Sequence, residues 1–552
     1  MSSVNRRAIT AATAGALTFL IAMQGCQDEL FSKDEKIIGP STSTQAIGNF
    51  DPASRSDSPP TSLEAAVEEA TRQGFAPPSY PSKVEVSLEA VRQSALANNL
   101  DLAVTRFDPS IGITRINQEL AKFEAVLNAS YTRNTTGFLT QLEEGVSTDT
   151  SNANLNVSVP LATGGTISAG TLFNQGDENL LIPGYEPWEA GVQVSISQPL
   201  LRGMGIRNNT ASIRIAKYQS RIVDARTKLQ AIRILADAEK AYWNLYRASK
   251  QLEVRVSQYE VAMKQLASAR RRVVQGVAAE IEVMRAESGM GTTIEQVIVA
   301  DNVLRLRQRD LKRFMNDSRV PVESPTALNP MTDAVPVSLQ FNDERLVGDA
   351  MGGRMELLEL ELQILVDAEQ IDLARNAALP NFVVSYQYQN LGDDTSIGSA
   401  YAAMGNSDGF VVTATATVPL GNEAAKSAVS RAILTRLQRL SSVEARKQAI
   451  TQEVLNAADT VENTWRRILA ARLEAVLAGR TLAGEQRQFE VGLRTSTDVL
   501  DAAARLADAQ SREVDALAGY EIALIDLAFA TGTTLGSAGI VLPDPVDPRT
   551  LQ

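Results

Sequence analysis

Two carboxylates stand three residues apart near the C-terminal end of the chain, in a stretch (residues 489–501) that joins two long apolar-periodic segments. Gly492 can adopt the left-handed conformation that ends a helix, and the hydroxyl groups of residues 495–497 can cap the next one. Asp498 and Asp501 then project from one face of the new helix, where the helix dipole favours negative charge. The spacing predicts a helical hairpin turn with paired acids at its tip.

A second copy of this pattern occurs earlier in the chain. Glu282 follows Gly276 at the same distance as Asp498 follows Gly492. If the pair Asp498 and Asp501 occurred alone, its simplest explanation would be a negative charge that only helps to start a helix. The repetition favours a second hairpin turn with a related role.

The amino-acid composition excludes most kinds of catalytic site. The chain has 552 residues, one cysteine and no histidine, so it cannot form a Ser-His or Cys-His pair or a zinc cluster. No G-x-x-x-x-G-K-[ST] loop is present, and Asn208 stands where a dinucleotide fingerprint beginning at Gly203 needs glycine. We therefore predict that the protein is not an enzyme and that it binds neither a cofactor nor a metal.

Charge and hydropathy further limit the classes of protein to which this chain could belong. The net charge is -12 and the pI is near 4.9, which argues against a nucleic-acid partner because no overall positive field gathers phosphates. The mean hydropathy is -0.10, and no apolar run reaches the roughly 18 residues that a membrane-spanning helix needs. A membrane crossing would therefore have to use strands.

The first 25 residues are predicted to be an export signal. Arg6 and Arg7 precede an apolar run over residues 8–23, and Gly25-Cys26 follows. Cys26 stands where a lipoprotein signal places its acylated residue; the alternative is an ordinary signal peptide with an incidental cysteine. Residues 26–83 are rich in Ser, Pro, Asp and Gly, a composition that predicts a flexible tether.

The remainder is predicted to hold two internal repeats, residues 84–320 and 337–535, joined by a linker (321–336) and followed by a tail (536–552). Each repeat is expected to run helix, helix, strand, strand, long helix, turn, helix. The opening helix is expected to follow Ser87 in the first repeat and to begin at residues 337–340 in the second. The second helical stretches are expected at about 105–126 and 357–378.

The strands are predicted from alternation of apolar and polar residues, at residues 128–131 and 192–197 in the first repeat and 381–388 and 412–418 in the second. About ten residues with one apolar face suit a tilted bilayer crossing, although a soluble sheet would explain any single segment. Pro199 and Pro419 are expected at the strand-to-helix junctions, because proline cannot donate to a ladder. An additional hairpin is predicted over residues 154–173.

Long coiled-coil helices are predicted after both prolines. Apolar residues recur every three or four positions over residues 211–275, and at Val454, Val461, Ile468, Ala475, Leu482 and Phe489 in the second repeat. Such helices would be about 100 Å long. Trp243 and Trp465 hold equivalent places in the two repeats and are expected to serve packing, with ligand binding as the alternative. The run Arg270–Arg272 is expected to be a solvated face, with partner contact as the alternative.

Four strands cannot close a barrel, and lipid does not tolerate their open edges, so several chains are expected to share one barrel.

The stretch from Val491 to Ala502 is similar to the tip motif V-G-x-R-T-x-x-D-V-L-D-A of the TolC-like outer-membrane efflux proteins. The resemblance covers roughly residues 86–535 and includes the duplicated motifs. It implies a mainly α fold with a β-barrel part, built as a homotrimer whose twelve-strand barrel continues into a helical tunnel across the periplasm. If the additional hairpin joined the wall, the trimer would have eighteen strands.

The resemblance also implies a function. A member of this family would be the outer-membrane exit duct of a tripartite efflux pump or a type I secretion system, working with a periplasmic adaptor and an inner-membrane pump. The alternative is a lipid-anchored structural coiled-coil protein without a pore.

Roles for the tip residues follow from the same resemblance. In the family, residues matching Arg494 and Glu282 form links that hold the inner hairpin closed. Phe489 departs from the tyrosine that the family often has there and cannot donate a hydroxyl hydrogen bond, so the ion pair is expected to matter more. If three chains meet at the tip, Asp498 and Asp501 would form a cation-selective ring.

Overall fold

The computed structural model describes residues 62–66, 69, 75–76, 78–80, 82–138, 146–175, 188–405 and 407–537. The chain forms two units, residues 1–76 and residues 77–552. In the first unit a short helical segment covers residues 63–66, and Ser62 Oγ accepts a hydrogen bond from the Ala65 N–H at 3.3 Å. The predicted export signal, Cys26 and most of the tether lie outside the described residues.

The second unit contains one antiparallel sheet of six strands in the order β2-β3-β4-β5-β7-β8. The strands are β2 (Val126–Phe138), β3 (Val146–Pro160), β4 (Thr166–Gln175), β5 (Trp188–Pro199), β7 (Asn381–Asp394) and β8 (Ser407–Thr417). The additional hairpin predicted at residues 154–173 is β3 and β4, and it lies between β2 and β5. Among the described residues the sheet therefore has six strands, two more than the four predicted without this hairpin.

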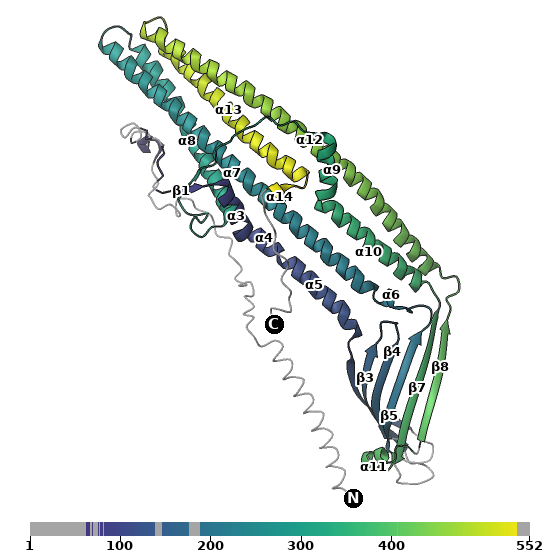
Figure 1. The fold of residues 1–552 in the computed structure, drawn as a ribbon. Helices are drawn as coiled ribbons and strands as arrows, with labels where there is room; N and C mark the ends of the chain where they lie inside the picture. Colours follow the sequence, from purple (N-terminus) through teal and green to yellow (C-terminus); the bar gives the residue numbers. More distant parts are fainter. Residues whose placement is uncertain are drawn as a thin grey trace. The chain divides into compact units, whose positions relative to one another are not determined.

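Four long helices form two antiparallel hairpins. The first hairpin is α7 (Ala211–Val274) with α8 (Ile281–Met315), and the second is α12 (Glu423–Glu490) with α13 (Ser496–Ala530). Contacts between α7 and α13 join the two hairpins. Figure 1 shows both hairpin turns at the end of this unit that lies away from the sheet. At 1.5 Å per residue, α7 and α12 are each about 100 Å long.

The apolar periodicity predicted for α12 is confirmed. All six residues of its seven-residue repeat are buried, from Val454 near the middle of the helix to Phe489 in its last turn. Trp243 is buried between Tyr242 and Tyr246 in edge-to-face contacts, and Trp465 lies 6.0 Å from the Tyr520 ring, so both tryptophans pack as predicted. None of the described helices is long and apolar enough to span a membrane.

Shorter helices cover the sides of the long ones (Figure 1). They are α3 (Leu88–Asn98), α4 (Leu100–Thr105), α5 (Phe107–Leu120), α9 (Asp343–Gly353) and α10 (Met355–Ala377), with α6 (Ile206–Asn209) and α14 (Thr534–Ser537) as single turns. The short helix α11 (Ile397–Ala402) instead packs against β5 and β7 of the sheet. α3, α4 and α5 pack on α7, α9 packs on α12, and α10 lies against α7 and α12.

The two opening helices begin differently. Ser87 caps α3 as predicted, because its side chain accepts the Ala90 N–H at 3.2 Å. The second opening helix was expected at residues 337–340 but begins at Asp343, where Asn342 supplies the cap. The expected segment is not helical because it is docked on α13 instead, where the Tyr520 hydroxyl donates to the Val337 carbonyl.

The start of this unit is tied to the predicted linker by a small parallel sheet. β1 (Lys83–Val86) pairs with β6 (Ala327–Pro330). Just before β1, the Tyr80 hydroxyl donates to Asp301, which also pairs with Arg305 at 2.8 Å. Burial and the Asp301 carboxylate raise the pKa of Tyr80 to about 12. The chain is thus fixed to α8 where the tether was predicted to end.

Candidate functional site at the hairpin tips

The two hairpin turns have the same backbone geometry. Gly276 and Gly492 have φ values of 72° and 83°, in the left-handed region that a side chain disfavours. In each turn the residue after the glycine donates its N–H to a carbonyl five positions back: Val277 to Arg272 at 3.0 Å and Leu493 to Gln488 at 2.9 Å. These bonds satisfy the carbonyls left open at the ends of α7 and α12.

Asp498 is engaged in starting α13. Its carboxylate accepts the Thr495 backbone N–H at 2.9 Å and the Thr495 hydroxyl at 2.8 Å. Thr495 Oγ1 accepts the Asp498 N–H in return, which completes a capping box. The hydrogen bonds from the Thr495 backbone and side chain hold the pKa of Asp498 below its usual value. Asp501, one turn further on, is exposed.

Glu282 and Arg494 have separate partners within one chain. Glu282 accepts the Ser496 N–H at 2.8 Å and pairs with Arg285 at 2.7 Å. It therefore neutralises the open N-terminus of α13 from the other hairpin. Arg494 lies 3.1 Å from Glu485 and donates to Gln488 at 3.0 Å. The predicted link between Glu282 and Arg494 stays a prediction, because these contacts describe a single chain.

Arg272 contacts the second hairpin, which the sequence interpretation missed. Its guanidinium donates to the Phe489 carbonyl and lies over the Phe489 ring, with 4.8 Å from the guanidinium carbon to the ring centroid. The expectation of a solvated arginine run is wrong for Arg272, which is half-buried, whereas Arg270 and Arg271 are exposed. Arg272 lies in the last turn of α7, where basic side chains commonly bind the unpaired carbonyls of a helix end. This position is the sequence signal that could have predicted its contact with a backbone carbonyl.

Further contacts bring four helices together behind the turns. Ser496 is fully buried, and its hydroxyl accepts a hydrogen bond from Gln265 at 3.2 Å. α8 approaches α13 closely at Gly289, where an added Cβ would lie 2.5 Å from Leu500 Cδ1. The tip is therefore one packed assembly of both hairpins.

A polar seam continues from the tip along α7 and α13. Lys240, Arg247 and Arg255 on α7 pair with Asp526, Asp515 and Asp508 on α13. The Arg255–Asp508 distance is 3.0 Å, and Gln251 donates to Asp515 at 2.7 Å. Burial raises the pKa of Asp515. In these three ion pairs α7 supplies the cations and α13 the carboxylates.

The outer ends of the tips are apolar and exposed. Val274 is 89% exposed and Leu493 is 76% exposed, and Val277, Met284 and Val491 are also exposed. Large apolar side chains gathered at two adjacent tips are typical of a surface that contacts a partner.

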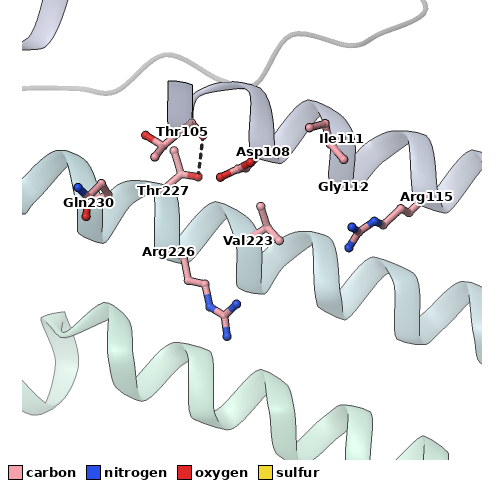
Figure 2. Close-up of a pocket in the computed structure, with 9 residues that line it drawn as sticks. All are labelled: Thr105, Asp108, Ile111, Gly112, Arg115, Val223, Arg226, Thr227 and Gln230. Carbon is pink, nitrogen blue, oxygen red and sulfur yellow. Dashed lines mark hydrogen bonds between the residues drawn. The ribbon is translucent and has the colours of Figure 1, made fainter. Parts of the chain in front are cut away.

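A separate cavity lies between α4–α5 and α7, far along the helices from the tips (Figures 1 and 2). Its volume is about 310 Å³, and its lining includes Thr105, Asp108 and Arg226. Thr227 donates to the Thr105 carbonyl at 3.4 Å, and the Arg226 side chain points away from α5 (Figure 2). Arg226 pairs with Glu359 of α10 at 2.6 Å. The cavity is a gap in helix packing whose Arg226 is already neutralised.

The two predicted junction prolines lie at strand exits. Pro199 is the last residue of β5 and stands opposite Val383 in β7. Pro419 follows the end of β8 at Thr417 and precedes α12.

Comparisons with known proteins agree with this arrangement. Residues 346–533 match the family model described as Outer membrane efflux protein. The chain is 22% identical over 343 residues to the outer membrane protein TolC of Vibrio cholerae, covering 62% of this chain and 76% of that one. It is also 22% identical over 383 residues to the outer membrane protein TolC of Salmonella enteritidis, covering 66% of this chain and 75% of that one.

Solved structures share the fold. The Campylobacter jejuni outer membrane channel CmeC matches with a TM-score of 0.61 at 13% identity, covering 81% of this chain and 86% of that one. The open state of the Neisseria gonorrhoeae outer membrane channel MtrE matches with a TM-score of 0.58 at 16% identity, covering 84% and 98%. The resemblance to the outer-membrane efflux proteins that the tip motif predicted is confirmed.

Proposed function

We propose that this relative of the outer membrane efflux proteins is the outer-membrane exit duct of a tripartite efflux pump or a type I secretion system. Small molecules or proteins would pass outward through it. The observation that carries the proposal is the sheet, which has one exposed apolar face and continues into helices about 100 Å long.

The apolar face of the sheet suits lipid. Phe410 and Val412 on β8 are 69% and 60% exposed, and Val194 on β5 and Tyr386 on β7 are exposed as well. These side chains belong to neighbouring strands: Tyr386 stands opposite Val412, and its ring stacks on that of Phe410 at 6.1 Å. Exposed apolar residues in adjacent strands are stable where the solvent is hydrocarbon.

The other face of the sheet is polar. Gln387 donates to Gln193 at 3.4 Å, and the hydroxyls of Ser168 and Ser195 lie 2.9 Å apart. These residues alternate with the apolar ones along β4, β5 and β7. A sheet with this division can separate lipid from an aqueous channel.

The edges of the sheet call for partner chains. β2 and β8 are the outermost of the six described strands, and unpaired backbone groups are costly in lipid. Pairing β8 of one chain with β2 of the next would close a barrel. Three chains, the number that the resemblance implies, would supply eighteen strands, and the helices would form a tunnel in the periplasm.

The helical tips would then form the periplasmic entrance. Three copies of Asp498 and Asp501 around one axis would repel each other by about 2 kcal/mol per pair at roughly 7 Å and an effective dielectric near 20. Such a ring favours bound cations, so the entrance would be cation-selective. The exposed apolar tips would contact the periplasmic adaptor, which in turn joins the inner-membrane pump.

Conductance across a planar lipid bilayer tests the proposal. The purified full-length protein should give discrete, cation-selective channels. The Arg494→Ser variant should conduct more than the wild type, because it weakens the predicted links that hold the tips closed. A protein that inserts but never conducts, in either form, would instead be the structural stalk.

A further inference from the structure

We propose that Arg272 is the latch that holds the tip of the second hairpin, α12–α13, against the first, and that this contact sets the resting conductance. The inference rests on the proposed function for its consequence but on the structure for the contact itself. It assigns a gating role to a residue outside the tip motif.

Arg272 makes two contacts of different chemistry with one residue of the other hairpin. Its guanidinium donates to the backbone carbonyl of Phe489, and the same planar group lies over the Phe489 ring with its carbon 4.8 Å from the centroid. The first contact holds the backbone of α12 and the second holds a side chain. Together they fix both the position and the rotation of the last turn of α12.

The partner residue is itself anchored. The Phe489 side chain is buried in a cluster with Leu482, Val499, Ala502 and Ala503 of the second hairpin, and Val261 of α7 packs against the same cluster. Its carbonyl also accepts the Gly492 N–H at 3.0 Å, so it belongs to the turn. A displacement of Phe489 would therefore move both helices of the second hairpin.

Gly492 lies beside this contact. A Cβ built at Gly492 would lie 3.4 Å from an Arg272 guanidinium nitrogen, which is an ordinary van der Waals distance, so the arginine lies directly against the glycine. The glycine also permits the left-handed turn.

Two other contacts hold the start of α13 from the first hairpin, through Glu282 and Gln265 to Ser496. The turn is therefore held from two sides, with Arg272 on the end of α12. The side chain of Phe489 has no hydroxyl group that could form a hydrogen bond. Arg272 therefore contacts the face of the Phe489 ring and the Phe489 backbone carbonyl. Removal of Arg272 takes away the polar link to the end of α12, while Val261, Glu282 and Gln265 of the first hairpin keep their contacts with the second.

The first test compares single-channel conductance of the full-length protein with that of four variants. Arg272→Ala should increase the time spent in high-conductance states by about tenfold. Arg272→Lys, which keeps the charge but loses the planar group, and Phe489→Leu, which keeps the carbonyl but loses the ring, should give smaller increases. Arg271→Ala is the matched control, since Arg271 is exposed on the same turn, and should leave conductance unchanged.

The second test measures the tips without reference to a pore. Spin labels at Val274 and Leu493, in a Cys26→Ser background, report the distance between the two tips by double electron-electron resonance. Arg272→Ala should shift or broaden this distribution, and Arg271→Ala should not. Unchanged melting temperature and assembly would show that the change is local.

The outcomes separate the two proposals. Wild-type channels with an Arg272→Ala variant of unchanged conductance and unchanged tip distance would overturn the latch. A protein that never conducts, but whose tip distance changes in Arg272→Ala, would overturn the proposed function and leave the latch as a structural contact. If Arg272→Ala fails to assemble, Arg272→Lys and Phe489→Leu carry the same comparison.

Discussion

At the scale of single residues, Asp498 and Asp501 show how identical side chains one turn apart acquire different roles. Asp498 is held by the backbone and hydroxyl of Thr495, and this capping box positions the first turn of α13. Asp501 is exposed. The simpler of the two predicted roles, a negative charge that helps to start a helix, explains the contacts of Asp498. The proposed cation ring therefore depends more on Asp501.

Asparagine substitutions should separate these roles. Asp501→Asn should weaken cation selectivity in bilayers with little change in melting temperature. Asp498→Asn should lower the stability of the tip, and Thr495→Ala should cost about 1 kcal/mol through the lost cap. Reversal potentials in a salt gradient and thermal melts in detergent measure the two effects. If Asp498→Asn and Asp501→Asn lost cation selectivity equally and neither changed the melting temperature, the two aspartates would not have the separate roles proposed here.

The Asp498 cap should also make the tip sensitive to acid. Because its pKa is lower in the folded tip than in the unfolded chain, the folded state binds fewer protons at this site. Its stabilisation is therefore fully present above about pH 4, the ordinary carboxylate range, and is lost as pH falls below it. Hydrogen exchange of residues 495–499, corrected for intrinsic rates, should show wild type and Asp498→Asn converging at low pH. A constant difference between them would argue against this cap.

At the scale of elements, the hairpins are held by two kinds of contact. Within the second hairpin, the seven-residue repeat of α12 buries its apolar side chains. Between the hairpins, the seam of α7 and α13 includes ion pairs and hydrogen bonds such as Arg255–Asp508 and Gln251–Asp515. Apolar side chains of α13, Ile522, Ile525 and Phe529, also pack against the buried cluster that includes Tyr242 and Leu245 of α7. The two hairpins are therefore held together by polar and apolar contacts.

The repeat of α12 should dominate the stability of the second hairpin. Ile468→Ala should destabilise it by roughly 2–5 kcal/mol, because Ile468 is buried and its removal leaves a cavity. Arg466→Ala is a matched control two positions away. Its ion pair with Glu462 is exposed and should contribute at most about 0.5 kcal/mol. Thermal melts followed by circular dichroism at 222 nm compare them, and similar midpoints would refute the buried-seam account.

At the scale of the whole molecule, the exposed surfaces determine assembly. The sheet ends at β2 and β8, one face of it is apolar, and α12 exposes Leu434, Leu437 and Leu473. These surfaces are costly in a single chain and would be covered by lipid or by neighbouring copies.

We expect the detergent-extracted protein to have the mass of three chains. The reason is that closing the sheet requires partners at both edges, and the resemblance implies three. Native mass spectrometry measures the number directly. A stable monomer that keeps its full strand content by circular dichroism would overturn the shared-barrel proposal.

The N-terminal anchor is a separate expectation. We expect mature protein that begins at an acylated Cys26, because Gly25-Cys26 ends the apolar run of the export signal. Intact-mass analysis of protein extracted from membranes tests this. An unmodified cysteine, or cleavage beyond residue 26, would leave the sheet as the membrane attachment.

Sequence alone determined the features that depend on neighbours within a few turns. The seven-residue repeat of α12, the turns at Gly276 and Gly492, the alternation in β7 and the cap at Ser87 all follow from local periodicity and backbone preference. The tip motif also predicted the resemblance to the outer-membrane efflux proteins. These rules act between residues close in the chain, so they can be recognised without a structure.

Only the tertiary structure decided which distant groups meet. Arg272 and Phe489 are 217 positions apart, and Glu282 and Ser496 are 214 apart. Their contacts arise because two separately predictable hairpins pack at one particular rotation and register. The same holds for β3 and β4, whose alternation predicted a hairpin but not its place between β2 and β5. Such pairings depend on the packing of whole elements, which local spacing does not encode.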